Sequence, residues 1–310
     1  MIELRLFRYF VAVAETLHFT RAAELLGIAQ PPLSQQIKKL ECDLNVQLFR
    51  RSKRKVELTE AGEVFLEHAR ATLRAAEQAV EQARRAAAGK EGRLAIGMVS
   101  SVTYEDLVSA VVLRFRAQCP NVELTLQELT TPQQIKLLHT GEIHIGFIRP
   151  PIQDPAVVLE IVKREQLLVA LPIAHPLARR KQIPILALAT EPWVTLPSDL
   201  GLGFYDLVLS QCHEAGFTPN VSQVATQIHT LISLVAAGLG VTLVPASVSS
   251  LRRTGVVYRK LAHETPLVET CVAYLKSAQS PVLDNFIHAV RTVRRLQRPN
   301  RFSAFSQNLK

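Results

Sequence analysis

The stretch FTRAAELLGIAQPPLSQQIKKL, residues 19–40, constrains the fold of this chain more than any other. It predicts two short helices joined by a tight turn, because Gly27 stands where a helix end favours a left-handed residue. Pro31 and Pro32 suit the first turn of the second helix, where backbone N–H groups lack intrahelical partners. The residues predicted to face the core are Ala22, Ala23, Leu25 and Leu26, then Leu33, Ile37 and Leu40.

The second of these helices keeps a polar, basic outer face. Because Leu33, Ile37 and Leu40 form one apolar stripe, the residues between them point away from the core. This is the layout of a helix-turn-helix, whose second helix enters the DNA major groove with its N-terminal residues toward base edges. An ordinary helical hairpin with a solvated face has the same pattern, so the hairpin alone leaves both interpretations open.

A basic segment follows the hairpin. FRRSKRK, residues 49–55, carries five cations, and Val56 to Leu58 reads as a strand before Thr59, the predicted N-cap of a new helix. Such a run is often only solvated surface, but beside a helix-turn-helix it predicts a wing along phosphates or in the minor groove. The candidate DNA contacts are Gln30, Pro31, Pro32, Ser34, Gln35 and Lys38 in the helix, and Arg51, Lys53 and Arg54 in the wing.

Three segments together resemble a known family. RYFVAVAE, FTRAAELLGIAQPPLSQQIKKLE and LFRRSKRKVELTEAG are similar to the winged helix-turn-helix of LysR-type transcriptional regulators, and the rest of the chain fits that family. The Pro-Pro pair, RLAIGMVSS and LVAAGLGVTLVPAS most resemble the branch that senses aromatic-catabolism intermediates such as benzoate, muconate or chlorocatechols. Members of that branch often carry Arg where this chain has Gln35, and Gln prefers adenine edges where Arg prefers guanine.

Composition agrees with a cytoplasmic DNA-binding protein. A length of 310 residues predicts two or three domains, and the net charge of +9 indicates a polyanionic partner. The opening MIELRLFRYF is not a signal peptide, and no apolar run is long enough to span a membrane. The four cysteines are isolated, which favours reduced thiols over a redox switch or a zinc site. We expect no metal and no cofactor.

Residues 60–88 predict one long helix. Its alanine-rich seam, with Phe65, Ala69, Leu73, Ala76, Ala79 and Ala83, favours a homodimer over a lone surface helix. A homotetramer is implied only by the family resemblance. The segment 89–92 should end the helix and act as a hinge.

From residue 93 onward, strands alternate with helices, including a helix predicted over 104–118. The pattern predicts open parallel sheets in two α/β lobes that the chain crosses twice, resembling periplasmic solute-binding proteins, the fold of the family's effector domain. The predicted domains are 1–58 (winged helix-turn-helix), 59–89 (linker helix) and 90–310 (effector domain), with lobe I over 93–164 and 266–300 and lobe II over 165–265.

Ligands of open α/β sheets bind at the carboxyl ends of the strands. Polar residues follow three predicted strands, and the glycine-rich segment 197–204 and a helix start at 227–229 face them from the second lobe. The candidate effector contacts are Ser100, Ser101, Thr131, Arg149, Phe204 and Ile228. Each Ser or Thr taken alone is equally consistent with a simple helix N-cap. By resemblance, Ser100, Ser101, Thr131 and Phe204 fall where the aromatic-acid branch holds its effector.

These features predict a transcriptional regulator that binds double-stranded DNA and a small carboxylate effector, with RNA polymerase as a partner that the family implies. A solute-binding protein for transport is the alternative, opposed by the winged module and the missing signal peptide. An enzyme is disfavoured, because the sequence has no nucleophile elbow, P-loop, metal cluster or paired carboxylates at usable spacing, so no catalytic residue is assigned.

Overall fold

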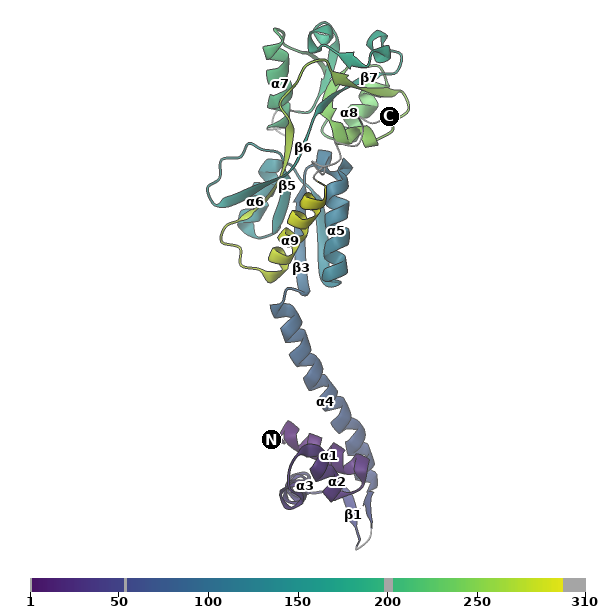
Figure 1. The fold of residues 1–310 in the computed structure, drawn as a ribbon, viewed down its shortest axis with the longest axis vertical. Coiled ribbons are helices and arrows are strands. Elements are labelled where there is room, and N and C mark those ends of the chain that lie inside the picture. Colours follow the sequence, from purple (N-terminus) through teal and green to yellow (C-terminus); the bar gives the residue numbers. More distant parts are fainter. Residues whose placement is uncertain (1, 53–54, 198–202, 298–310) are drawn as a thin grey trace, which may run out of the picture. The chain divides into compact units, whose positions relative to one another are not determined.

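The computed structural model describes residues 2–52, 55–197 and 203–297, which fall into two compact units, Met1–Arg85 and Ala86–Lys310 (Figure 1). Of the predicted site residues, Lys53 and Arg54 lie outside the described residues, as do 198–202 of the predicted glycine-rich segment and the end of the predicted lobe I. Each unit is described by itself. No helix within the described ranges is long and apolar enough to cross a membrane.

The first unit is a winged helix-turn-helix. Its elements are α1 (Leu4–Thr16), α2 (Phe19–Leu26), α3 (Gln30–Leu44), β1 (Phe49–Arg51), β2 (Val56–Leu58) and α4 (Glu60–Ala87). The ring of Phe10 is fully buried, 5.2 Å from that of Phe49 and 4.9 Å from that of Phe65. Gly27 adopts φ +68° at the turn between α2 and α3, as the sequence predicts. The strands β1 and β2 pair antiparallel and form the predicted wing.

The predicted apolar stripe of α3 is confirmed, because Leu33, Ile37 and Leu40 are all fully buried. The prediction for Leu25 was wrong, since its side chain is 75 % exposed. Successive residues of a helix are about 100° apart, so Leu25 lies outside the arc that buries Ala22 and Ala23.

The long helix α4 spans the predicted residues, and both of its ends pack against neighbouring elements. Ala69 is fully buried in the core of the winged unit, where Phe65 also packs, so these two seam positions serve the unit's own core. At the far end, Gly89 has φ +65°, and a Cβ there would lie 2.4 Å from the carbonyl carbon of Pro281. The Asn285 amide also donates to the carbonyls of Ala88 (2.9 Å) and Gly89 (3.1 Å). The helix ends close to the predicted residue, and Gly89 packs closely against Pro281.

The second unit contains two sheets, and the first has the strand order β4-β3-β5-β13-β6. The strands are β3 (Glu91–Met98), β4 (Asn121–Glu128), β5 (Ile145–Ile148), β6 (Val157–Glu165) and β13 (Val268–Leu275). The prediction of a parallel sheet was wrong in part, because β13 runs antiparallel to both β5 and β6. The strand β6, VVLEIVKRE, was not predicted from the sequence.

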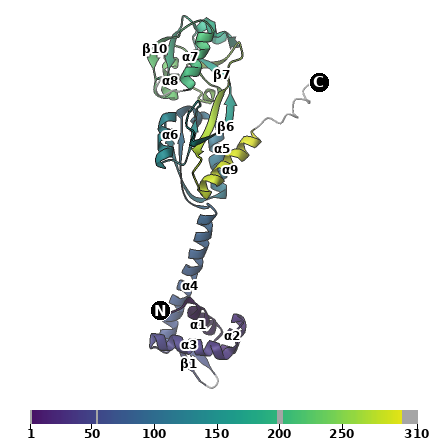
Figure 2. The same ribbon diagram turned by 90° about the vertical axis from the view of Figure 1, so that its left-hand side faces the viewer.

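Helices cover this sheet in both views of the fold (Figure 2). They are α5 (Asp106–Gln118), α6 (Thr131–Thr140) and α9 (Pro281–Leu296), and a 3-10 turn, η1 (Ser100–Tyr104), precedes α5. The helix predicted from residue 104 therefore begins two residues later. Phe115 and Phe286, with ring centroids 5.2 Å apart, join α5 to α9 in the core.

The second sheet of this unit has the strand order β11-β7-β12-β8. Its strands are β7 (Leu167–Pro172), β8 (Gln182–Ile183), β11 (Thr242–Pro245) and β12 (Val256–Leu261); β9 (Pro192–Thr195) pairs parallel with β10 (Asn220–Val224), and the helices are α7 (Phe204–Glu214) and α8 (Ile228–Ala236). Short 3-10 turns complete the lobe: η2 (Pro176–Arg179), η3 (Ile185–Leu188) and η4 (Ala246–Ser250). The chain enters from β6 into β7 and returns from β12 into β13, so it crosses between the lobes twice, as predicted.

Candidate functional site

The outer face of α3 carries the predicted base-reading residues. Gln30 and Gln35 are exposed, as is Lys38, while Ser34 is half-buried and lies 2.9 Å from the Gln30 amide nitrogen that donates to its hydroxyl. Pro31 and Pro32 are also exposed in the first turn. These side chains therefore occupy one solvent face at the start of the helix, where a recognition helix presents hydrogen-bonding groups to base edges.

Two cations of the wing, Arg51 and Lys55, form ion pairs within the protein. Arg51 forms an ion pair with Glu41 of α3 at 2.7 Å, and its guanidinium carbon lies 5.0 Å from the centroid of the Phe19 ring. Lys55 pairs with Glu57 on the neighbouring strand at 2.5 Å, which holds the pKa of the Glu57 carboxyl below its usual value. The predicted contacts Lys53 and Arg54 lie outside the described residues.

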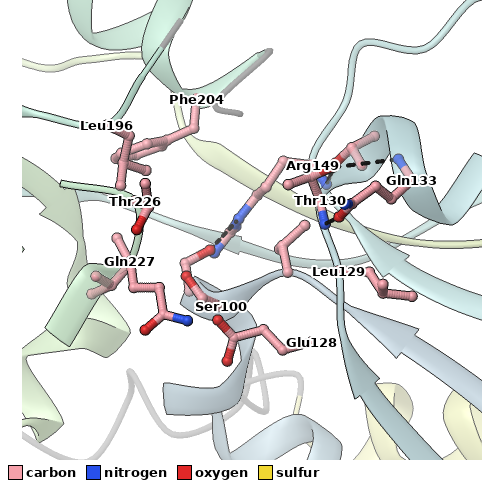
Figure 3. A pocket seen from close by; sticks show the side chains of 14 residues that line it. Ser100, Glu128, Leu129, Thr130, Gln133, Arg149, Leu196, Phe204, Thr226 and Gln227 are labelled. Atoms are coloured by element: carbon pink, nitrogen blue, oxygen red, sulfur yellow. Dashed lines mark hydrogen bonds between the residues drawn. The ribbon is translucent and has the colours of Figure 1, made fainter. Parts of the chain in front are cut away.

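A cavity of about 200 Å³ lies between the lobes of the second unit (Figure 3). All six predicted effector residues line it, so the structure brings together side chains from five separate segments. The lining residues are Val99, Ser100, Ser101, Glu128, Leu129, Thr130, Thr131, Gln133, Arg149, Leu196, Phe204, Thr226, Gln227 and Ile228. Phe204 and Leu196 supply an apolar wall from the second lobe, opposite the polar residues of the first.

Two helices from opposite lobes begin at this cavity. Thr130 caps α6: its hydroxyl accepts from the backbone N–H of Gln133 at 3.3 Å, and its own backbone N–H donates to the side-chain oxygen of Gln133 at 2.9 Å. The N-cap residue of α8, Gln227, forms no side-chain cap. Helix N-termini attract anions through unpaired N–H groups and the helix dipole. The strand end at Ser100 leads only into the 3-10 turn η1, so the α-helix N-terminus predicted there is absent.

Arg149 does not offer a free charge to this cavity, because it is 4 % exposed and all its side-chain nitrogens have partners. Its Nε donates to the Ser101 hydroxyl at 3.3 Å, Nη1 donates to the Thr270 hydroxyl at 2.8 Å, and Nη2 donates to Glu105 at 3.1 Å and Glu165 at 3.2 Å. Burial raises the pKa of the Glu105 carboxyl, although the positive charge of Arg149 opposes this shift. The guanidinium therefore organises the floor of the cavity.

Glu165 extends this buried network to the second lobe. Its carboxylate accepts from the backbone N–H of Ser247 at 2.7 Å and from the Ser247 hydroxyl at 3.1 Å. Neither glutamate was predicted, because an acid on a half-polar strand and another after a 3-10 turn resemble surface residues in the sequence. Among the other unpredicted lining residues, Val99, Thr130 and Gln227 directly adjoin predicted ones along the chain, whereas Leu196 comes from the end of a neighbouring strand, β9.

Among the described residues, no group of three or more His, Cys, Asp and Glu side chains could hold a metal ion. Buried thiols such as Cys212 and Cys271 have pKa values raised by burial to about 12 and about 11, so they are poor nucleophiles near neutral pH. The residues that line the cavity offer a ligand hydrogen bonds, helix N-termini and apolar contact.

Two family models match the chain. Residues 4–63 match the bacterial regulatory helix-turn-helix protein of the lysR family, and residues 87–295 match the LysR substrate binding domain. The first therefore covers most of the winged unit, and the second covers both lobes that enclose the cavity.

Curated relatives match along nearly the whole chain. The transcriptional regulator AlsR of Bacillus subtilis is 42 % identical over 93 % of this chain and 95 % of its own length. CatR of Pseudomonas putida is 39 % identical over 91 % of this chain and 96 % of its own, and HcaR, the hca operon transcriptional activator of Escherichia coli, is 38 % identical over 94 % and 97 %.

Solved structures give the same result. CbnR in complex with its target DNA is 30 % identical and superposes with a TM-score of 0.84 over 94 % of this chain and 100 % of that one. Full-length BenM is 32 % identical with a TM-score of 0.60 over 95 % and 97 %. On two family models, full-length relatives and a shared fold, the chain belongs to the LysR family of DNA-binding transcriptional regulators, which are not enzymes.

Proposed function

We propose that this regulator binds its operator through the exposed face of α3 and the wing, and that a small carboxylate in the cavity between the lobes controls its activity. The proposed DNA binding is supported by the solvent face that carries Gln30, Gln35 and Lys38, and by the net charge of +9. The relative CbnR was solved on its target DNA. A protein that acts on the chromosome in this way works in the cytoplasm.

The main support for the proposed effector binding is that two α-helix N-termini converge on one cavity. The starts of α6 and α8 contribute Thr131 and Ile228 to the lining, and the Ser101 hydroxyl can donate to a ligand while it accepts from Arg149. Such a site favours a carboxylate over a neutral or cationic ligand. At about 200 Å³ the cavity is smaller than the roughly 300–1,000 Å³ of drug-sized ligand sites. The effector is therefore a small acid.

The wall formed by Phe204 and Leu196 suits an acid that carries a ring or an unsaturated chain. Sequence identity does not choose the branch, since AlsR at 42 % and CatR at 39 % are similarly related to this chain. We therefore infer the aromatic or unsaturated character of the effector from the wall of the cavity.

The effector arm is tested by thermal denaturation of the full chain with benzoate, muconate, acetate and succinate, each at increasing concentration. A ligand at one hundred times its Kd adds about 2.7 kcal/mol to stability. For a domain of about 200 residues this raises Tm by roughly 5–10 °C. Benzamide is the matched neutral control for benzoate. Equal shifts with benzoate and benzamide would contradict carboxylate recognition.

We also propose that the chain forms a homodimer through α4, and a homotetramer by the family's pattern. Beyond the winged core, Ala79 and Ala83 are exposed along one side of this helix, and close helix packing favours alanine. Replacing Ala79 by Glu should place like charges in the dimer seam and yield monomers in sedimentation, whereas Gln78→Glu adds the same charge on another face. An unchanged oligomer in the Ala79→Glu variant would contradict this interface.

A further inference from the structure

One acidic residue of the recognition helix turns its carboxylate toward the protein. Glu41 lies in the last turn of α3, and its side chain is 13 % exposed. One carboxylate oxygen accepts from the backbone N–H of Leu48 at 3.0 Å and of Phe49 at 3.1 Å. The other accepts from Nη2 of Arg51 at 2.7 Å. A carboxylate bound by three donors in this way is a strong and directional anchor.

These three bonds join the recognition helix to the wing. Phe49 and Arg51 are the first and last residues of β1, the strand through which the chain enters the wing. Because β1 pairs with β2 along its whole length, fixing β1 fixes the hairpin. Arg51 adds a second link, since its guanidinium carbon lies 5.0 Å from the centroid of the Phe19 ring in α2. Both helices of the helix-turn-helix therefore hold the same strand.

We propose that Glu41 is a positioning residue for DNA binding: it sets the angle between the wing and the recognition helix, and Arg51 is its tether within the protein rather than a phosphate contact. The proposal rests on the DNA binding proposed above. A helix in the major groove and a wing on the neighbouring backbone bind together only when their separation matches the duplex. Loosening β1 should therefore reduce specific binding more than non-specific attraction to phosphates.

Removing the charge of Glu41 separates two explanations, because a role through charge alone and a role as an anchor predict opposite changes in DNA affinity. Removing an acid near DNA strengthens attraction to any duplex if the acid acts only through its charge. Losing an anchor weakens binding to the operator alone. Glu41→Gln keeps an acceptor for the Leu48 and Phe49 N–H groups but removes the charged partner of Arg51. Arg51→Gln removes the tether from the other side and guards against misfolding of the first variant.

The experiment is a gel-shift titration of the full chain at four salt concentrations. The probes are a duplex from upstream of the protein's own gene and a scrambled duplex of the same length. For Glu41→Gln we expect affinity for the upstream duplex to fall about tenfold. Affinity for the scrambled duplex should hold or rise. A parallel rise or fall on both duplexes, or no change on either, would overturn the positioning role.

For Arg51→Gln we expect the same selective loss on the upstream duplex, with an unchanged slope of log K against log salt on the scrambled one. A phosphate contact at Arg51 would instead lower that slope by about 0.9. Such a lowered slope would overturn the assignment of Arg51 as a tether. Failure of the unaltered protein to bind either duplex would be a different result, since it would overturn the proposed DNA binding itself.

Discussion

The proposed DNA-binding face and the proposed effector cavity are built in opposite ways. The base-reading part of that face comes from a single element, α3, whose buried stripe of Leu33, Ile37 and Leu40 turns the residues between them outward. The cavity draws on six segments spread from Val99 to Ile228 and on both lobes. Helical periodicity therefore determines the first site, whereas only the topology of two sheets assembles the second. A substitution that disrupts the packing of one site should leave the packing of the other intact.

Truncating one large buried side chain in the core of each unit tests that independence with the largest expected effect. Phe10 and Phe286 are both fully buried, one in each unit. Truncating either to Ala should cost about 3–5 kcal/mol of its own unit's stability. In calorimetry, Phe10→Ala should lower the unfolding transition of the winged unit and abolish operator binding, while ligand affinity is retained. Phe286→Ala should do the reverse. A single transition shifted equally by both variants would contradict two separately folded units.

A smaller effect is expected at the hydroxyl that joins the cavity to Arg149. Ser101→Ala removes the hydroxyl that we propose donates to the effector carboxylate and that accepts from the Arg149 Nε–H. Loss of one hydrogen bond to a charged group costs about 1.5–3 kcal/mol, so the effector should bind roughly ten- to a hundredfold more weakly. Calorimetry with the carboxylate that gives the largest thermal shift measures this. Ser109→Ala, exposed on α5, is the control. Equal affinity in all three proteins would place the ligand elsewhere.

On the DNA face, single residues should divide base reading from phosphate attraction. Gln35→Ala should cost about 1–3 kcal/mol at one operator base pair and leave other positions unchanged. Lys38→Ala should weaken binding to many sequences more evenly if it contacts phosphates. A competition assay with every single-base operator variant separates the two. If Gln35→Ala weakened every sequence equally, the orientation assigned to α3 would be wrong.

The smallest effect should appear in acid. Arg291 of α9 holds the pKa of the Glu160 carboxyl on β6 below its usual value, and the Tyr274 hydroxyl adds a bond of 2.7 Å. A carboxyl with a lowered pKa stabilises the fold above about pH 4.5, and this contribution disappears as the pH falls through the native pKa. Because Arg291 is half exposed, the effect should be about 1 kcal/mol or less.

Arg291→Leu should therefore flatten the acid side of the effector domain's stability curve between about pH 5 and pH 2, as urea unfolding at each pH would show. Lys55→Leu is the corresponding change in the wing. It should have no such effect, because Glu57 is exposed to solvent. Equal flattening by both variants would mean that exposed pairs contribute as much as the sheet-to-helix pair.

The sequence predicted local structure well and long-range pairing less well. Helix α5 was predicted to within two residues of its observed bounds, and the return of the last strand to the first sheet was also expected. The direction of β13 and the existence of β6 were missed, since both depend on partners more than a hundred residues apart. Phe65 and Ala69 fit a dimer seam by spacing, but helical period alone does not identify which neighbour covers them.

The predicted site shows the same division. Each of Ser100, Ser101, Thr131, Arg149, Phe204 and Ile228 was found from its place at a strand or helix end, and all six line the cavity. The sequence could not predict which carboxylates pair with the Arg149 guanidinium. Its partners Glu105 and Glu165 are far from it in the sequence, and their carboxylates neutralise the charge of this predicted effector contact.

On binding in the cavity, the proposed carboxylate should change how the winged module holds DNA. The most direct measurement is a footprint of the full chain on its own upstream DNA, with and without the carboxylate that most raises Tm. It should be repeated with Leu196→Trp, which fills the cavity without touching the DNA-binding face. The protected region should change with ligand in the unaltered protein and stay constant in the filled variant. An identical ligand response in both proteins, or none in the unaltered protein at saturation, would contradict the account.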